Sequence, residues 1–187
     1  MITSRFALCA LALMTAAPAA AQDFDIKSFF AKADSEGRVG LAQKTKPVFA
    51  RPATPGEVVV TIVPDDGLET KSKPAEAGDM AVNNRCGAND RSEYLVKAAQ
   101  FPKRYSEALS PADDKGWRQY RPLGVSMRYV VMKPSEGPWN FQAPWGEAMV
   151  AKPGDTIVQD PNNPADTYRV AKSAFDCTYE ITKAAAQ

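Results

Sequence analysis

"KPGDTIVQD", residues 152–160, begins a series of residues whose spacing occurs a second time earlier in the chain, after "EAGDMAVNN", residues 76–84. The matched pairs are Gly78 and Gly154, Asp79 and Asp155, Val82 and Val158, Tyr94 and Tyr168, Val96 and Val170, Phe101 and Phe175, and Tyr105 and Tyr179. The offset between the copies is nearly constant, and it changes only in loops. We therefore interpret residues 45–106 and 120–182 as two copies of one small module.

The residues of each copy favour short antiparallel strands. Glycine allows a tight turn and the aspartate side chain bonds neighbouring backbone, so each Gly-Asp pair predicts a hairpin bend. Stretches such as "EVVVTIV" (57–63) and "VSMRYVVM" (125–132) are rich in β-branched and aromatic residues. The Phe-x3-Tyr spacing at the end of each copy predicts one helical turn. The expected fold is α+β and β-rich, with two tandem antiparallel-sheet modules that are each closed by a short helical turn.

Other elements are expected outside the two modules. In residues 22–44 the spacing of Ile26, Phe29, Phe30 and Ala33 predicts an amphipathic helix, followed by an extended linker. "SPADDKGWRQYRP" (110–122) has the Gly, Pro and polar residues of a connection, so the linker between the modules is placed at residues 107–119. Residues 183–187 form a tail. Each module is near the lower size limit for independent stability, so we expect the two to share an interface.

The best-matching stretches, "KPGDTIV", "TYRVAK" and "AFDCTYE", resemble the small PGDYG-type module found in many bacterial and phage proteins. The pattern of that family is a Pro-Gly-Asp turn into an apolar strand, an aromatic strand, and a closing Phe-x3-Tyr element. The first copy departs from it, with Ala77 in place of the proline, and Met80 and Thr156 stand where the pattern prefers an aromatic residue. The resemblance implies a fold and no activity, because the family has no established one.

The first 21 residues have the pattern of a secretory signal peptide. Arg5 precedes the uncharged apolar run "FALCALALMTAAPAAA" (6–21), which ends before Gln22. The run is too short for a spanning helix, which needs about 20 apolar residues, so we expect cleavage after Ala21 and a periplasmic or secreted protein. A retained N-terminal anchor is the alternative. Cys9 is interpreted as an apolar residue of the run and not as a lipid attachment site.

The charge composition excludes several classes of function. Lysine and arginine number 23 and aspartate and glutamate 22, and removal of the leader takes away only Arg5, so the mature chain is formally neutral. No basic cluster of the kind that binds nucleic acid or an anionic membrane is present. The chain also contains no histidine, which excludes the catalytic and zinc sites that depend on it. We expect no nucleic-acid partner and no cofactor.

Two cysteines, Cys86 and Cys177, remain after the leader. In an exported protein, an even number of cysteines without metal-site spacing favours a disulfide. The alternative is two separate thiols that are buried as small apolar residues. We expect the bond, which would join the polar loop "NNRCGAND" (83–90) of the first module to the closing helical turn of the second.

Aromatic and arginine residues of "GWRQYRP" (116–122) and "GPWNFQAPWGE" (137–147) are the candidates for a binding surface. Partly exposed tryptophan, tyrosine and arginine anchor many interfaces. The alternative is that these aromatic side chains form core and linker packing. The candidate binding residues are Trp117, Arg118, Tyr120, Arg121, Trp139 and Trp145, and we expect the first four to approach a hairpin flanked by the last two.

Carboxylate groups provide no catalytic or metal motif. "DPNNPAD" (160–166) has oxygen ligands at alternating positions, but it lacks the glycine and the final glutamate of an EF-hand loop. We interpret it as a surface loop and expect no metal site. The pairs Asp65-Asp66 and Asp113-Asp114 lie in turn-like surroundings and are assigned no catalytic role.

Two kinds of function fit these observations. The first is a non-catalytic binding or structural module of the cell envelope, with a protein or an envelope polymer as its partner. The alternative is a glycosidase-like enzyme, because a carboxylate pair can act without histidine. An enzyme should have a concave pocket with converging carboxylates, whereas a binding module should present a shallow aromatic surface. We favour the first hypothesis because no catalytic motif is present.

Overall fold

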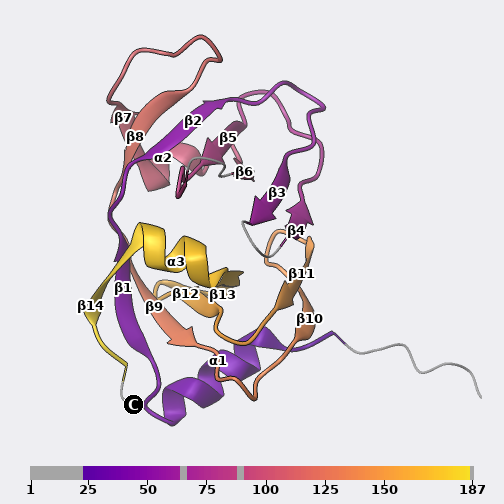
Figure 1. Cartoon of the computed structure of the whole chain (residues 1–187), viewed down its shortest axis with the longest axis vertical. Helices are drawn as coiled ribbons and strands as arrows, with labels where there is room; N and C mark the ends of the chain where they lie inside the picture. The colour runs from indigo at the N-terminus through magenta and orange to yellow at the C-terminus, as the bar shows by residue number, and fades with distance from the viewer. Residues whose placement is uncertain (1–22, 64–66, 88–90, 186–187) are drawn as a thin grey trace, which may run out of the picture.

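The computed structural model describes residues 23–63, 67–87 and 91–185, and all strand pairs within them are antiparallel. Two larger sheets lie towards opposite ends of the molecule's long axis, with a two-stranded sheet beside them (Figure 1). The expected β-rich antiparallel fold is therefore confirmed. The predicted signal peptide lies outside the described residues.

The larger sheet has seven strands in the order β4-β3-β6-β5-β2-β8-β7. Their bounds are β2 Val48–Pro52, β3 Val60–Val63, β4 Gly67–Lys71, β5 Met80–Asn83, β6 Arg91–Val96, β7 Tyr105–Ala108 and β8 Arg118–Pro122. The short helix α2 (Phe101–Arg104) leads directly into β7. Its Phe101 packs with Tyr105, Val48 and Val82 in one buried cluster, which covers one face of this sheet.

The second sheet has five strands in the order β13-β12-β9-β1-β14. Their bounds are β1 Gly40–Lys44, β9 Ser126–Val131, β12 Thr156–Asp160, β13 Asn163–Val170 and β14 Tyr179–Lys183, and helix α3 (Lys172–Thr178) precedes β14. Phe175 of α3 packs on Tyr129 and Val158 on one face of the sheet. Val130 and Ile157 point into a different cluster, so both faces of this sheet are covered.

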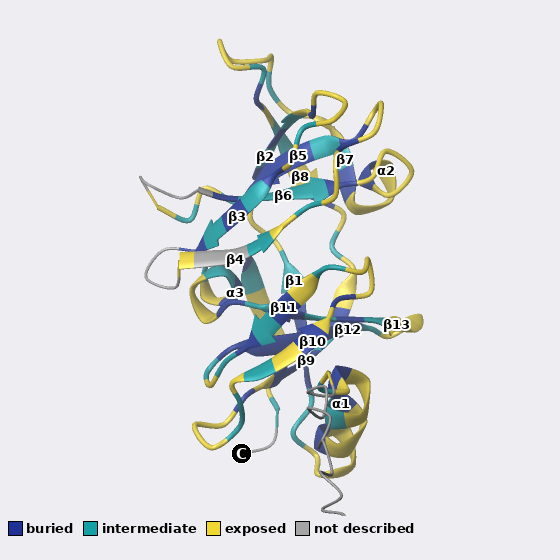
Figure 2. Cartoon of the chain, turned by 90° about the vertical axis from the view of Figure 1, so that its right-hand side faces the viewer, coloured by how far each residue is buried: buried dark blue, intermediate teal, exposed yellow. Residues whose placement is uncertain are grey.

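Helix α1 (Ile26–Ser35) lies where the apolar spacing predicts a helix. It begins at Asp25, whose carboxylate accepts hydrogen bonds from the backbone N–H groups of Lys27 and Ser28, as a helix cap does. Its apolar face, with Phe30 and Ala33 fully buried, contributes to the cluster that contains Val130. Figure 2 shows this division between the buried and the exposed sides of α1.

A hairpin of β10 (Trp139–Gln142) and β11 (Ala148–Ala151) begins at Trp139 as predicted, but Trp145 lies in its turn and does not mark its end. At its turn, the Glu147 carboxylate accepts hydrogen bonds from the Thr70 hydroxyl and the Lys73 backbone N–H, both at 3.2 Å. The hairpin thus contacts β4, the outermost strand of the seven-stranded sheet.

Two strands lie where linkers were expected, and each pairs with the sheet of the other half of the chain. β1 precedes residues 45–106 in sequence but pairs with β9 and β14, which lie within residues 120–182. β8 spans the boundary between the expected linker and residues 120–182, but it pairs with β2 and β7 of the first half. Residues 45–47 and 123–125 carry the chain from one sheet to the other, as Figure 1 shows for the step from β1 to β2. The expected linkers at 22–44 and 107–119 are therefore wrong where they include these strands, which lack the apolar alternation that would identify them.

The two Gly-Asp turns have the same backbone geometry and side-chain bonding. Gly78 and Gly154 both have φ of +86°, a conformation that favours glycine. In each turn the aspartate accepts one bond from the backbone three residues before it and one from a residue close to the helix that follows. The donors are Glu76 and Ala98 for Asp79, at 2.9 and 3.0 Å, and Lys152 and Lys172 for Asp155, at 2.8 and 3.3 Å.

The hairpin bend that was predicted at these turns is wrong. β12, which follows the Gly154 turn, pairs with β9 and β13, whereas the preceding β11 pairs with β10. The Gly154 turn thus leads from the two-stranded sheet into the five-stranded sheet. At the Gly78 turn, β4 and β5 lie in the same seven-stranded sheet but do not pair with each other.

The predicted disulfide between Cys86 and Cys177 is confirmed, with their Cα atoms 5.8 Å apart. It joins the loop after β5 to helix α3. The bond therefore provides a third covalent connection between the two larger sheets, distant in sequence from the two crossing segments.

Candidate functional site

The four aromatic side chains among the six candidate binding residues lie in four separate packing environments. Trp117 is buried with Ala53, Val59, Ala75 and Ala81 against the seven-stranded sheet. The other residues of that stretch belong to β8, where Tyr120 packs edge-on against Phe101, and Arg118 and Arg121 are exposed. The packing partners of Trp117 and Tyr120 lie within residues 48–105, so the expected approach of these four residues to the hairpin flanked by Trp139 and Trp145 is not supported.

The other two tryptophans lie elsewhere. Trp139 stacks on Phe24 with ring centroids 4.0 Å apart, and it contacts Phe29 of α1 edge-on. This tryptophan therefore fixes the N-terminal helix to the hairpin. Trp145, which is 43% exposed, lies 5.5 Å from the ring of Tyr168, and its indole N–H donates to Glu147. Neither ring belongs to the cluster around Trp117.

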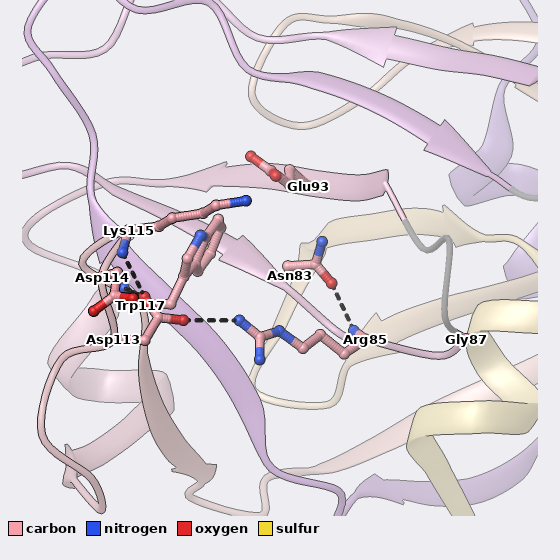
Figure 3. A pocket seen from close by; sticks show the side chains of 8 residues that line it. All are labelled: Asn83, Arg85, Gly87, Glu93, Asp113, Asp114, Lys115 and Trp117. Atoms are coloured by element: carbon pink, nitrogen blue, oxygen red, sulfur yellow. Dashed lines mark hydrogen bonds and ion pairs between the residues drawn. The ribbon is translucent and has the colours of Figure 1, made fainter.

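Trp117 instead lines a shallow, open pocket of about 390 Å³ on the seven-stranded sheet (Figure 3). The lining residues come from the end of β5 and the loop after it, from β6, and from the turn before β8. They are Asn83, Arg85, Gly87, Glu93, Asp113, Asp114, Lys115 and Trp117. Charged side chains of both signs thus surround one buried indole ring.

Arg85 has an unusual backbone conformation within this pocket. Among the described residues it is the one non-glycine with a positive φ, at 51°. Its backbone N–H donates to the Asn83 side chain at 2.6 Å, and the next residue is the disulfide-bonded Cys86. Residues with a Cβ atom rarely adopt this backbone conformation. The hydrogen bond to Asn83 and the neighbouring disulfide hold Arg85 in it.

The guanidinium group of Arg85 lies against an aromatic ring. Its central carbon is 3.5 Å from the centroid of Phe49 and 6.0 Å from that of Trp117, both within the range of cation–π attraction. The one side-chain hydrogen bond of Arg85 within the described part of the chain is to Asp113, at a marginal 3.5 Å. The edge of the guanidinium is therefore largely available to a ligand.

The carboxylates of the pocket are engaged by neighbouring groups. The other oxygen of Asp113 accepts the backbone N–H groups of Lys115 and Trp117, at 3.0 and 2.9 Å. Desolvation acts to raise the pKa of Asp113, but these N–H groups and the charge of Arg85 hold it below the ordinary value. Glu93 lies 3.6 Å from Arg51. Asp113 is thus held ionised, which suits recognition of charge rather than proton donation.

A second group of polar side chains lies between the two larger sheets. Lys44, the last residue of β1, donates its ammonium to Asn84 at 2.8 Å and to the Tyr94 hydroxyl at 2.9 Å. The hydroxyl groups of Tyr94 and Tyr105 are 2.9 Å apart. Burial, and then the charge of Arg104, lowers the pKa of Lys44 to about 7.

The tyrosines of this group remain neutral over a wide pH range. Burial raises the pKa of Tyr105 to about 12 and raises the pKa of Tyr94 well above its ordinary value. Tyr168 and Tyr179, which hydrogen-bond each other, have pKa values raised by burial as well. We interpret the group as a polar contact between the sheets, because its hydrogen bonds join residues of both.

Arg85, Asn83 and Lys44 were not identified from the sequence. The loop "NNRCGAND" was interpreted only as a polar loop able to adapt to the disulfide. For Arg85, the available signal was its place directly before Cys86, because a disulfide limits the movement of the residues next to it. Lys44 carried no signal, because its environment arises from a strand that pairs with the distant half of the chain.

Three further results concern similarity to known proteins, membrane spans and metal sites. Comparison with protein-family models, with curated proteins and with solved structures finds no match to this chain. No helix within the described residues is long and apolar enough to cross a membrane. The same residues contain no group of three or more histidine, cysteine, aspartate or glutamate side chains placed to hold a metal ion.

Proposed function

We propose that this chain is an exported, non-catalytic binding module of the cell envelope, and that the pocket around Arg85 and Trp117 is its recognition surface. The observation that carries the proposal is the constrained Arg85, whose guanidinium is stacked on Phe49 and has an available edge. A residue kept in a rare backbone conformation is a reasonable candidate for function. The leader-like N-terminus and the disulfide support export.

The shape of the pocket favours a macromolecular partner. Small-molecule sites are concave and bury most of their ligand, whereas this pocket is open, with Asp114 and Lys115 exposed at its rim. A protein segment or an envelope polymer can contact such a surface without being enclosed.

We also propose that the two halves are copies of one PGDYG-type module. The equal φ values of Gly78 and Gly154 and the matching bonds of Asp79 and Asp155 support this. So does the matching order of strands around the two short helices. The Arg85 loop has no counterpart in the second half, where β12 and β13 are joined by a tight turn, so only one half would carry the recognition surface.

The proposal is tested by exchanging two rim charges without altering net charge. The double variant Asp114→Lys/Lys115→Glu should lower the recovery of crosslinked envelope partners severalfold relative to the parent, as measured by quantitative mass spectrometry after pull-down with the mature protein. The matched control is Lys103→Glu/Glu107→Lys, which exchanges two exposed charges away from the pocket. Equal recovery by the two double variants would refute the assignment of the surface.

A carboxylate-dependent enzyme is the second candidate, because Glu93, Asp113 and Asp114 line one pocket. The lowered pKa of Asp113 argues against its use as a general acid, which requires a raised value. Release of soluble fragments from an envelope polysaccharide by the purified protein, and its loss in Glu93→Gln, would establish the enzyme and overturn the binding proposal.

A further inference from the structure

The chemistry of Arg85 indicates what the proposed surface binds. Five arginines of the described residues have a carboxylate oxygen at 3.0 Å or closer, namely Arg38, Arg51, Arg104, Arg128 and Arg169, whereas the exposed Arg118 and Arg121 of β8 do not. Arg85 has only the 3.5 Å contact with Asp113, and the two side chains are 43% and 47% exposed. An exposed pair of this length contributes little to stability. The guanidinium is therefore placed by its backbone and its ring contact and not by an ion pair.

The Asp113 side chain does not depend on Arg85. Its Oδ1 atom accepts two backbone N–H groups within its own turn, and only Oδ2 faces the guanidinium. A ligand anion can therefore replace Asp113 at Arg85 without disrupting the turn. Figure 3 shows the two side chains pointing toward each other beside the indole of Trp117.

The planar shape of the Arg85 guanidinium and the charges that line the pocket determine which type of anion fits. A planar guanidinium edge matches a planar carboxylate in a two-bond arrangement. The pocket is lined by three acidic and two basic side chains, which disfavours a doubly charged phosphate. The same acidic side chains attract a positive group on the ligand, so a chain that carries both charges is the best match.

We propose, building on the binding function above, that the pocket recognises a peptide segment that bears a free carboxylate together with a cationic side chain. The carboxylate replaces Asp113 at the edge of Arg85, and the cation lies near Asp114 and Glu93. The carboxylate belongs to a chain terminus or to an acidic side chain, which have the same chemistry at this contact.

The test uses the mature, disulfide-bonded protein and three peptides. These are acetyl-Lys-Ala-Ala as the free acid, the same peptide as its C-terminal amide, and acetyl-Lys-Ala-Glu amide, which has only a side-chain carboxylate. Binding is followed by NMR at the Arg85 side-chain N–H and the Trp117 indole N–H. At least one carboxylate peptide should bind at least about tenfold more tightly than the amide without one, because hydrogen bonds to charged groups are strong.

Matched variants separate the roles of the two side chains. Arg85→Gln should weaken binding of the carboxylate peptide at least about tenfold, by loss of the same charged bonds. Asp113→Asn keeps the turn acceptor and removes the competing charge, so it should tighten binding. Arg118→Gln, which changes an exposed arginine of β8, should leave affinity unchanged.

Several outcomes would overturn the inference. These are equal binding of the amide and both carboxylate peptides, tighter binding of inorganic phosphate, or unchanged affinity in Arg85→Gln. If the peptides fail while the exchange of Asp114 and Lys115 still lowers envelope capture, the recognition surface stands and only its ligand class is wrong. Failure of both measurements would refute the proposed function as well.

Discussion

At the scale of single residues, Arg85 occupies a position where glycine would be easier to accommodate. A left-handed conformation costs a residue with a Cβ atom about 1–2 kcal/mol. The Asn83 side chain and the disulfide hold the backbone, and the ring of Phe49 holds the guanidinium. The position thus places an arginine accurately at some cost in stability, which is typical of functional sites.

Replacing Arg85 with glycine tests this interpretation. Relief of the backbone strain and loss of the cation–π contact are of similar size, so the free energy of unfolding should stay within about 1 kcal/mol of the parent. Ligand capture should nevertheless be lost. Urea unfolding measures the stability, and a destabilisation well beyond that range would show that Arg85 has a structural role.

Lys44 should make stability depend on pH in a defined direction. Its pKa is about 7 in the folded protein and near its ordinary 10.5 in the unfolded chain. Between these values the unfolded state binds more protons, so the free energy of unfolding should rise as pH increases from about 7 toward 10. Above pH 10 it should fall, because unfolded tyrosines ionise while the buried Tyr94 and Tyr105 do not.

The variant Lys44→Met isolates the first part of this profile. It keeps the length of the side chain but removes the titrating amine, so the rise between pH 7 and 10 should disappear while the decrease above pH 10 remains. Lys46→Met, at an exposed site two positions along the chain, is the control and should retain the rise. Chemical denaturation across this pH range provides the measurement, and the idea fails if Lys44→Met shows the profile of the parent.

At the scale of elements, the two Gly-Asp turns have similar bonds but different ion partners. Asp155 pairs with Arg169, and the exposed fractions of the two side chains are only 7% and 2%. Asp79 pairs with Lys97, which is 47% exposed. Water can therefore solvate Lys97, the partner of Asp79, but hardly reaches Arg169, the partner of Asp155.

This difference predicts unequal effects of the same substitution. Asp155→Ala should cost about 3–5 kcal/mol, because it removes a carboxylate from a buried arginine. Asp79→Ala should cost about 1–3 kcal/mol, mainly for backbone N–H groups left without that acceptor. Urea unfolding of the two variants compares them directly, and equal losses would contradict the role assigned to burial.

The elements that could be predicted are those with a local signal. The positions of the Gly-Asp turns and of several strands, such as β3, β9, β12 and β13, follow from residue type and spacing within short stretches. β1 and β8 were missed because "GLAQK" and "RQYRP" lack apolar alternation. Their strand conformation comes from partners in distant parts of the sequence, β9 for β1 and β2 for β8, which no local pattern reveals.

The candidate site was found only in part for a related reason. Trp117 was selected for its residue type, and it does line the pocket. Arg85 is important because of its backbone conformation and its position over Phe49, which belongs to a different strand. Trp139 and Trp145 have the same composition signal as Trp117 but pack elsewhere, since residue type does not specify location.

At the scale of the whole molecule, the disulfide connects the two larger sheets across a separation of 91 residues in sequence. Closing a loop of that length should contribute about 4–5 kcal/mol on the chain-entropy model. The double variant Cys86→Ala/Cys177→Ala should lose most of this in urea unfolding. Reduction of the parent protein should give a similar loss, and little change in either experiment would contradict the expected contribution.

The exchange of β1 and β8 between the sheets has a consequence for the way the protein unfolds. Neither sheet can separate from the other while intact, since the strand next to one edge of each sheet is supplied by the opposite half of the chain. We therefore expect one all-or-none transition in calorimetry, with equal calorimetric and van't Hoff enthalpies, although the chain has two large sheets. Thermal unfolding that starts in either half would then disrupt the pocket around Arg85 and the polar contact between the sheets at the same temperature.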